Sequence, residues 1–304
     1  MRNLLQGMAA ALIVATAALS VAAGEAEKYT LRYKFYPGET LRWNVEHQSR
    51  VRATVSGSTQ ETETLSISVN DWNVTDVQPD GTATFEHRVE WVDMRQTLTG
   101  RKEVRYDSRT GGKPPVGFED AARSVGVPLS IVKMDAQGKV LHRTNTKQRP
   151  AVAHAKSAVD KSAPENVGWL TIPLPDGPVP VGYTWSLPQD IDVPLPSGGV
   201  KKVKAVQQFT LESVKTGVAT IRVSTEILTP ISDPAVESQL VERESAGIVR
   251  FDIDAGRILG QQMDIDKHVV GFRGDASSIH YLNRFSERLL TGEARTAERK
   301  GIRD

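Results

Sequence analysis

The chain contains no cysteine among its 304 residues, which excludes several kinds of chemistry at once. It can form no disulfide, it offers no thiol nucleophile, and it lacks the acceptor for a lipoprotein-type lipid anchor. A Gly-x-Ser-x-Gly elbow, a phosphate-binding loop and a dinucleotide fingerprint are missing as well. We therefore expect a protein that is not an enzyme, with no catalytic residues and no cofactor.

An excess of charge of one sign is also lacking. The chain has 38 Lys and Arg residues against 37 Asp and Glu residues, a net charge of +1. Nucleic acids and anionic membrane surfaces attract proteins with a basic field, which a balanced chain does not have. We expect no nucleic-acid partner. After the N-terminal segment no run approaches the roughly 20 apolar residues of a membrane helix, so no membrane span is expected there.

The N-terminal segment has the features of a signal peptide. Arg2 provides positive charge, residues 8–19 form a short apolar stretch, and Val21-Ala22-Ala23 ends in the small residues that a signal peptidase needs. We expect cleavage after Ala23, which removes residues 1–23 and leaves a mature protein in the periplasm or outside the cell. An uncleaved N-terminal anchor is the alternative interpretation.

Beyond Lys28 the dominant sequence period is two, which is typical of half-buried β-strands. Leu65, Ile67 and Val69, for example, alternate with polar residues, and turn-forming residues separate such runs. We predict a mainly β fold of antiparallel sheet. Further sets of alternate residues predicted to share a face are Phe85, His87, Val89 and Trp91; Val203, Ala205, Phe209 and Leu211; and Ala219, Ile221, Val223 and Ile227.

Helical patterns are few. Phe118–Val125 and Pro234–Val241 each suit about two turns, and Pro150–Lys161 starts with proline before an Ala-rich stretch. Ser278–Leu290 fits either a last strand or a helix, and its aromatic alternation favours the strand. Eight of the 16 prolines lie in residues 164–196, so this segment suits an ordered linker that leads into an edge strand.

The chain repeats itself, and this is its most informative feature. Ile131–Leu141 matches Ile248–Leu259, each a hairpin with glycine in the turn. Two further pairs of segments match: Pro37–Leu41 with Val181–Trp185, and Trp72–Phe85 with Phe209–Ile221. The three matched segments follow one another in the same order in both halves of the chain. We predict two tandem, internally duplicated curved antiparallel sheets, half-barrel-like, each with a short helix. The apolar face of such a sheet must be covered by its helix, by the other half or by a ligand.

The matched blocks define the expected domain boundaries. Residues 24–148 form the first β repeat, 149–180 a helix and Pro-rich linker, and 181–290 the second β repeat. Residues 291–304 are a polar tail without an apolar face. The relative orientation of the repeats and the oligomeric state stay open at this point.

Three strings stand out around the start of the second repeat: Ile172-Pro173-Leu174-Pro175, Pro178-Val179 and Val181-Gly182-Tyr183-Thr184-Trp185. Together with the paired hairpins, in which Asp shortly precedes Gly-(Lys/Arg)-(Val/Ile), they resemble a family of exported bacterial β-rich proteins classed as a domain of unknown function. The resemblance covers most of the mature chain and implies scaffold residues but no catalytic set. A more distant likeness, to half-barrel carriers of the outer-membrane lipoprotein pathway, implies at fold level a curved sheet that holds acyl chains.

None of the six histidines has a second histidine at metal-ligand spacing. His87 follows the apolar face of its strand, and a core or rim histidine is favoured there over a catalytic base. The six are His47, His87, His142, His154, His268 and His280.

Acidic residues gather around Gly256. Asp252 and Asp254 precede this glycine, but the third acidic position and the distal glutamate of a calcium loop are missing. We interpret Asp254, like Asp135 in the first repeat, as a residue that caps its own turn. The returning strand carries Asp264, Asp266 and His268, which we expect on a solvent-exposed face, and no metal site is predicted.

The five tryptophans could line a pocket for a sugar or a lipid. Trp43, Trp72 and Trp185 stand at or near matched positions of the repeats, which favours a shared core role. Trp169, in the Pro-rich linker, is expected to be partly exposed, and Trp91 completes the set.

Three functions fit these observations. The first, which we favour, is a non-catalytic exported binding protein that holds a lipid or other hydrophobic small molecule in a curved-sheet groove. The second is a structural or protein-interaction component of the cell envelope, with an envelope protein as partner. The third is a hydrolase, whose site would have to join His87 or His268 to a carboxylate.

Overall fold

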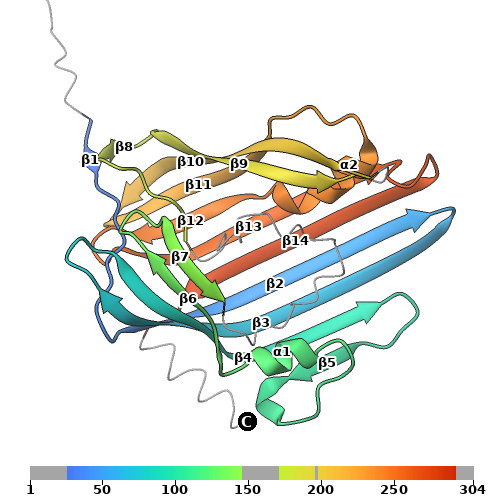
Figure 1. Cartoon of the computed structure of the whole chain (residues 1–304), viewed down its shortest axis with the longest axis horizontal. Helices are drawn as coiled ribbons and strands as arrows, with labels where there is room; N and C mark the ends of the chain where they lie inside the picture. Colours follow the sequence, from blue (N-terminus) through green and yellow to red (C-terminus); the bar gives the residue numbers. More distant parts are fainter. Residues whose placement is uncertain (1–25, 146–170, 196–197, 292–304) are drawn as a thin grey trace, which may run out of the picture.

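The computed structural model describes residues 26–145, 171–195 and 198–291, and most of them lie in β-strands (Figure 1). The strands are β1 (Lys28–Tyr29), β2 (Thr40–Val55), β3 (Ser58–Val77), β4 (Ala83–Leu98), β5 (Val104–Asp107), β6 (Pro128–Met134), β7 (Val140–Asn145), β8 (Val179–Pro180), β9 (Thr184–Pro194), β10 (Val200–Lys215), β11 (Val218–Ile227), β12 (Ala246–Asp252), β13 (Arg257–Val270) and β14 (Ser277–Leu289). The helices are α1 (Glu119–Ser124), α2 (Pro234–Leu240) and the 3-10 turns η1 (Ser108–Thr110) and η2 (Val241–Arg243).

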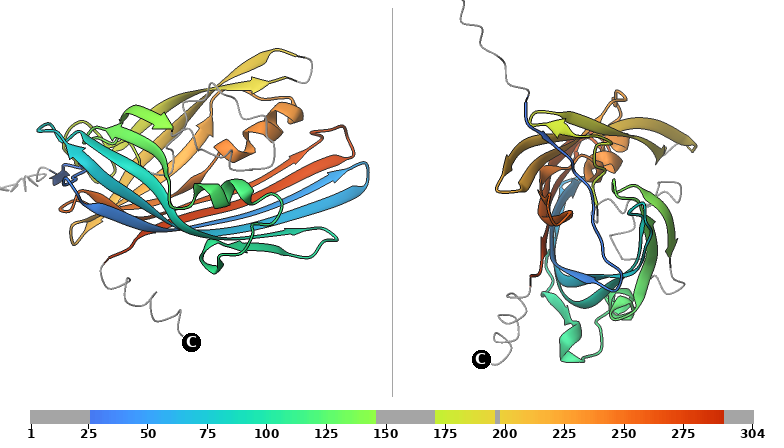
Figure 2. Two further views of the ribbon diagram at one scale, coloured as in Figure 1. Left: turned by 60° about the horizontal axis from the view of Figure 1, so that its bottom comes forward. Right: turned by 90° about the vertical axis from the view of Figure 1, so that its left-hand side faces the viewer.

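One antiparallel sheet of 12 strands dominates the structure. Its order is β7-β6-β4-β3-β2-β14-β13-β12-β11-β10-β9, with β5 beside β4, while β1 and β8 form a separate two-stranded sheet. In the end view of Figure 2 the large sheet bends around the chain segment that leads from β1 to β2. The predicted mainly β, antiparallel and curved architecture is confirmed.

The two repeats are visible in the strand pairing. Val74 of β3 pairs with Phe85 of β4, and Leu211 of β10 pairs with Ile221 of β11, with a register shift directly after each pair. The backbone N–H of Gly38 donates to the carbonyl of Val74 at 2.9 Å, and that of Gly182 donates to the carbonyl of Leu211 at 2.7 Å. Strands β2, β3, β4, β6 and β7 therefore correspond to β9, β10, β11, β12 and β13.

The two predicted short helices occupy equivalent places in the repeats. α1 lies between β4 and β6, and α2 lies between β11 and β12. The carboxylate of Asp233 accepts a 2.8 Å hydrogen bond from the N–H of Ala235 and so caps α2, which begins with Pro234. α2 buries Val236 and Leu240, whereas α1 buries none of its side chains.

β14 joins the repeats into one sheet. It lies between β13 of the second repeat and β2 of the first, so that Tyr281 pairs with both Lys267 and Val51. The strand is therefore confirmed over the helix for Ser278–Leu290. The two repeats share a continuous sheet and are not packed face to face.

The glycine turns of both duplicated hairpins accept backbone hydrogen bonds from the same N-terminal segment, residues 31–35. The N–H of Tyr33 donates to the carbonyl of Ala136 at 2.8 Å, and the N–H of Lys34 donates to the carbonyl of Gly256 at 2.9 Å. The first turn is capped as predicted, because Asp135 accepts from the N–H of Lys139 at 2.9 Å. The prediction for Asp254 is wrong.

In the second turn the capping residue is Asp252. Its carboxylate accepts from the N–H of Ala255 at 2.8 Å. Asp252 corresponds to Asp135 in the matched hairpins, since Phe251 and Met134 occupy equivalent register positions just before them. The extra residue in the second turn moves Asp254 to the surface.

The two faces of the sheet differ in character. We call the face that carries Trp72, Phe85, Phe209 and Phe251 the inner face, and the opposite one the outer face; these four side chains are at most 2% exposed. The predicted inner sets on β10 and β11 are confirmed. On β3, by contrast, Ser66, Ser68 and Asn70 face inward. The apolar residues that alternate with them, Leu65, Ile67 and Val69, lie on the outer face, because they pair with outer residues of β2.

Trp91 does not share the face of Phe85 and His87. A register shift on β4 places Val89 opposite Asn70 and Trp91 opposite Val69, so one extra residue between them turns Trp91 to the outer face. There the guanidinium of Arg109 lies 4.1 Å from the centre of its ring. Strict alternation could not show this bulge.

Several expectations fall on residues that the structure does not describe. They are the signal peptide, Pro150–Lys161, His154, Trp169 and residues 292–304. The described part of the linker leads through β8 into β9. β9 lies at an edge of the sheet and contains Pro188, so the predicted Pro-containing edge strand is confirmed.

Candidate functional site

The inner face carries three separate groups of apolar side chains. The largest packs segment 31–35 against both repeats at one end of the sheet and includes Trp43 and Trp72. The second lies under α2, and the third includes Ile265, Val269 and Tyr281 near the centre of the sheet. Trp43 and Trp72 are 3% and 2% exposed, so their predicted core role is confirmed, and Trp185 packs partly buried against the same group.

Part of the inner face in the first repeat is only half covered. Val89, Met94 and Leu98 lie on the inner side of β4, opposite Asn70, Ser66 and Thr62 of β3, and all three are half-buried, whereas Val92 on the same side between them is 6% exposed. α1 buries no side chain, whereas α2 of the second repeat packs Val236 and Leu240 over Val203 and Ala205 of β10. We call Val89, Met94 and Leu98 the β4 strip.

A row of buried polar groups borders the β4 strip. Trp72, His87 and Ser130 are directly opposed across β3, β4 and β6, and they are 2%, 8% and 0% exposed. In the described structure the indole N–H of Trp72, both ring nitrogens of His87 and the hydroxyl of Ser130 have no hydrogen-bond partner. A buried polar group without a partner costs about 1–3 kcal/mol of stability. We call these three residues the polar row.

His87 is held neutral by its surroundings. Burial, with a smaller contribution from the positive charge of Arg143, lowers the pKa of His87 to about 4. The prediction of a buried histidine on the apolar face is confirmed, but the hydrogen-bond partner expected of a core histidine is missing from the described residues.

The centre of the inner face contains a second buried polar group. Glu287 of β14 is 5% exposed, and the side-chain amide of Gln261 donates to its carboxyl at 2.6 Å. Burial raises the pKa of Glu287 to about 8, so this carboxyl is protonated at neutral pH. Nearby, the amide of Asn283 lies 2.5 Å from Nε2 of His47.

The outer face has a shallow groove that crosses several strands, with a volume of about 690 Å³. Its charged side chains are of both signs and are largely paired: Arg284 donates to Asp264 at 2.7 Å, and Arg50 lies 2.5 Å from Glu63. Apart from Glu103, which precedes β5, the residues come from β13, β14, β2, β3 and β4, so only the strand order brings them together. No local sequence pattern could therefore indicate this groove.

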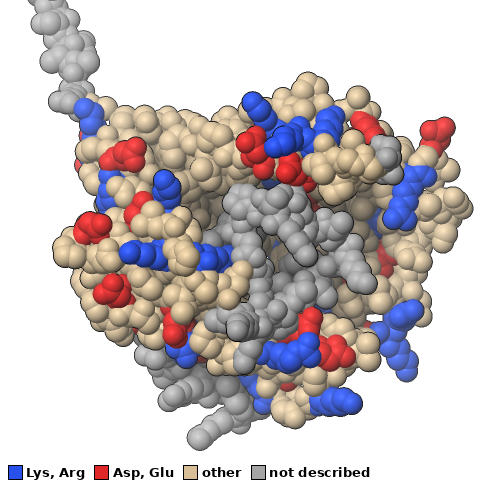
Figure 3. Space-filling model, viewed as in Figure 1, with Lys and Arg blue, Asp and Glu red and all other residues tan. Residues whose placement is uncertain are grey.

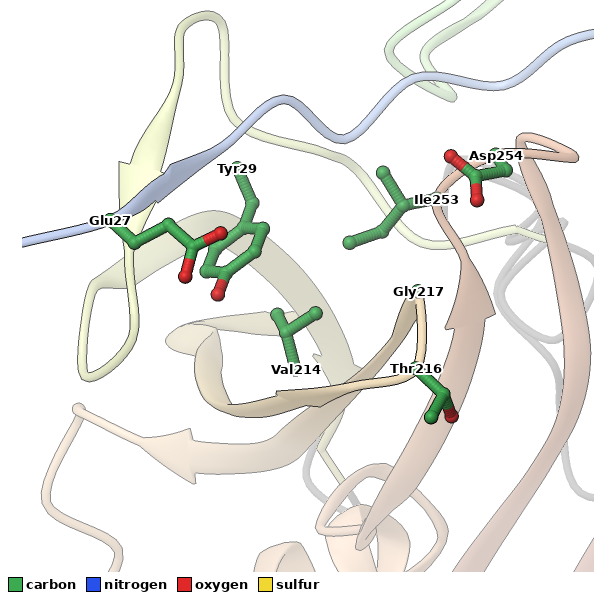
Figure 4. A pocket seen from close by; sticks show the side chains of 7 residues that line it. All are labelled: Glu27, Tyr29, Val214, Thr216, Gly217, Ile253 and Asp254. Atoms are coloured by element: carbon green, nitrogen blue, oxygen red, sulfur yellow. The ribbon is translucent and has the colours of Figure 1, made fainter.

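A smaller pocket of about 350 Å³ lies at the N-terminal end of the described chain (Figure 4). Glu27 and Tyr29 line one side, and the Thr216-Gly217 turn with Asp254 lines the other. A hydrogen bond with Glu27 raises the pKa of the Tyr29 hydroxyl. The pocket combines two carboxylates with the apolar side chains of Val214 and Ile253.

The remaining candidates lie on the outer face. Asp264, Asp266 and His268 alternate with buried inner residues of β13, as predicted for an exposed strand face. The carboxylate of Asp266 lies 2.8 Å from Nε2 of His280, and the His268 ring lies 5.7 Å from the His280 ring. Within the described residues, His87 has no hydrogen-bond partner, and no three acidic or histidine side chains are grouped to hold a metal ion.

The charges on the molecular surface are mixed in sign. Among the described residues visible in Figure 3, basic and acidic side chains are interspersed. Among the helices that the structure describes, none has the length and apolar character needed to cross a bilayer.

Comparison with known proteins gives distant structural likeness only. No protein-family model matches the chain, and no curated protein matches it. Lipovitellin, from a structure concerned with its lipid–protein interactions, superposes with a TM-score of 0.43 and 10% identity over 85% of this chain; the chain spans only 26% of the lipovitellin chain. The translocator domain of the autotransporter NalP from Neisseria meningitidis gives a TM-score of 0.25 and 7% identity, covering 83% of this chain and 89% of that domain. Similarity at this level carries no conclusion about function, and the resemblance to exported β-rich proteins stays a prediction.

Proposed function

We propose that the protein is a non-catalytic, exported binding protein that holds the apolar part of a small molecule against the inner face of its sheet. The observation that supports this most directly is the β4 strip. Val89, Met94 and Leu98 are half-buried on the inner face of a curved sheet, in the repeat whose helix buries no side chain. Apolar surface on the concave side of a sheet is where small-molecule ligands commonly bind.

The second repeat indicates what full coverage of this face looks like. There α2 places Val236 and Leu240, each 1% exposed, over Val203 and Ala205. Removing apolar surface from water contributes about 25 cal/mol per Å², so an apolar ligand that covers the β4 strip is stabilised by the same effect that stabilises α2 over β10.

The test is to purify the protein from its own compartment and to examine it by native mass spectrometry. We expect a co-purified small apolar mass. Met94→Arg, on the β4 strip, should abolish it, whereas Thr97→Arg, on the outer face of the same strand, should leave it in place. If the protein carries no such mass and does not enhance the fluorescence of an added apolar dye, the proposal fails.

A structural or protein-interaction role in the cell envelope is the second candidate. The outer-face groove of about 690 Å³, with charges of both signs, supports it. Under this alternative, reversing the sign of Arg284 should weaken association with an envelope partner, while the Met94→Arg variant should retain it.

A further inference from the structure

At one level of the inner face the two repeats place opposite kinds of side chain. The polar row of the first repeat consists of Trp72, His87 and Ser130, paired directly across β3, β4 and β6. The equivalent row of the second repeat consists of residues that are paired in the same way across β10, β11 and β12. They are Phe209, Val223 and Gly247.

The equivalence is set by the neighbouring row and not by sequence similarity alone. Two residues before His87, Phe85 pairs with Val132, and two residues before Val223, Ile221 pairs with Val249. All four of these side chains are fully buried. The same scaffold is therefore built once with an apolar row and once with a polar row.

Folding does not require the polar row, because the second repeat forms without one. Phe209 and Val223 are 0% exposed and leave no polar atom to satisfy. In the first repeat, polar atoms of Trp72, His87 and Ser130 are buried without partners in the described structure. The three polar groups destabilise the fold, and the second repeat shows that apolar residues can replace them. We therefore infer that they serve a purpose other than folding.

The chemistry of the row is rich in donors. The indole N–H of Trp72 can only donate, the Ser130 hydroxyl can donate, and a neutral His87 offers one N–H. The row contains no carboxylate. Arg143 of β7 is paired with Val132, one row away from the Ser130–Asn145 pair, and its positive charge acts on His87.

The row also has an accessible neighbour. On the inner face, the next pair of β3 and β4 residues beyond Trp72–His87 is Asn70 with Val89, and both are half-buried. Val89 is the first residue of the β4 strip. Polar donors therefore lie where the sealed apolar core ends and the half-covered apolar surface begins.

We propose that Trp72, His87 and Ser130, with Arg143 beside them, bind the carboxylate head group of an amphiphile whose apolar chain lies along Val89, Met94 and Leu98. This assignment rests on the proposed function and names the chemical class of its ligand. A carboxylate accepts several hydrogen bonds at once and is stabilised by a nearby guanidinium. A cation or an uncharged apolar ligand would leave the three donors unpaired.

The test compares dodecanoate with 1-dodecanol, which has a chain of the same length but no charge. Isothermal titration calorimetry should show that the protein binds dodecanoate at least about tenfold more tightly than dodecanol, as charge-assisted hydrogen bonds imply. The triple variant Trp72→Phe, His87→Val, Ser130→Ala, which gives the first repeat an apolar row like that of the second, should bind the two probes equally. Trp91→Phe, on the outer face, should keep the preference of the unaltered protein.

A second measurement reports on the row itself. In the unaltered protein, dodecanoate should shift the indole N–H resonance that Trp72→Phe removes, and dodecanol should not. If the triple variant fails to fold, Ser130→Ala alone should reduce the preference about threefold or more. Equal binding of both probes by the unaltered protein, or a preference that survives the triple variant, overturns the carboxylate site while leaving the proposed function standing. Binding of neither probe overturns both.

Discussion

Glu287 of β14 lies directly opposite Gln261 of β13, and the side-chain amide of Gln261 donates a 2.6 Å hydrogen bond to the Glu287 carboxyl. Glu287 therefore belongs to the strand that joins the two repeats, and Gln261 to the neighbouring strand of the second repeat. The raised pKa of Glu287, about 8, means that the folded protein keeps a proton there that the unfolded chain releases near its ordinary value of 4.5.

The first prediction concerns the pH dependence of Glu287. Between pH 4.5 and 8 the folded state binds more protons than the unfolded state, so this group makes stability fall as the pH rises. The full change is on the order of 5 kcal/mol. Glu287→Gln should stabilise the protein at pH 8 and remove this decline in urea unfolding. Glu226→Gln, which alters an exposed carboxyl on β11, should leave the profile unchanged, and a similar decline in both variants would contradict the prediction.

The second prediction is that His87 acts in the opposite direction. Its folded pKa of about 4 lies below the ordinary 6.5, so the unfolded chain binds the extra proton between these values and stability rises with pH. The contributions of His87 and Glu287 therefore oppose each other from pH 4.5 to 6.5. His87→Val should give stability that falls with pH across this range, and Glu287→Gln should give stability that rises by about 3 kcal/mol. Slopes of the same sign in the two variants would refute this assignment.

The third prediction uses the glycines of the duplicated turns. A Cβ atom at Gly138 would lie 2.5 Å from the carbonyl oxygen of Ile172, and one at Gly256 would lie 2.7 Å from that of Arg32. Both residues also have positive φ. Gly138→Ala and Gly256→Ala should each lower the free energy of unfolding by about 3 kcal/mol, from backbone strain together with the steric clash.

A matched control separates the two contributions. Gly57 also has positive φ, but a Cβ atom there would meet nothing within 4 Å. Gly57→Ala should therefore cost only about 1 kcal/mol, the contribution of the backbone alone. Thermal unfolding of the three variants checks this, and equal losses would show that the close approach to segment 31–35 contributes nothing.

The fourth prediction concerns the attachment of β5. Asp93 is 5% exposed and accepts two hydrogen bonds from Arg105 of β5, at 2.9 and 2.7 Å. This pairing lowers the pKa of Asp93, so its contribution to stability is present above pH 4 and is lost as the pH falls further. Asp93→Asn should accelerate amide hydrogen exchange in residues 104–107 and destabilise the protein by roughly 1–2 kcal/mol, because Arg105 is half exposed. Asp76→Asn, at an exposed position, should change neither.

The sequence was sufficient for features that depend on neighbouring residues. Alternation predicted the strands, and the matched blocks predicted equivalent hairpins, because the two strands of a hairpin are close in sequence. The capping role of Asp135 followed from its position before Gly138. The same reasoning failed for Asp254, because one additional residue in the turn moved the cap to Asp252.

Features that depend on distant pairing could not be predicted. No local pattern indicates that β14 lies beside β2, and the bulge that turns Trp91 outward is visible only in the register with β3. The polar row is a third case. Trp72, His87 and Ser130 are far apart in sequence, and their common level on the inner face appears only once the strand order is known.

The position of β14 also bears on how the protein assembles. This strand comes last among the described elements, yet it fills the middle of the sheet, and Leu289 pairs with Trp43. Until it docks, β2 and β13 expose two long unpaired edges that invite pairing with other chains. A second copy could donate its own β14 to the same gap, so exchange of this strand is the route by which the protein would form a domain-swapped dimer.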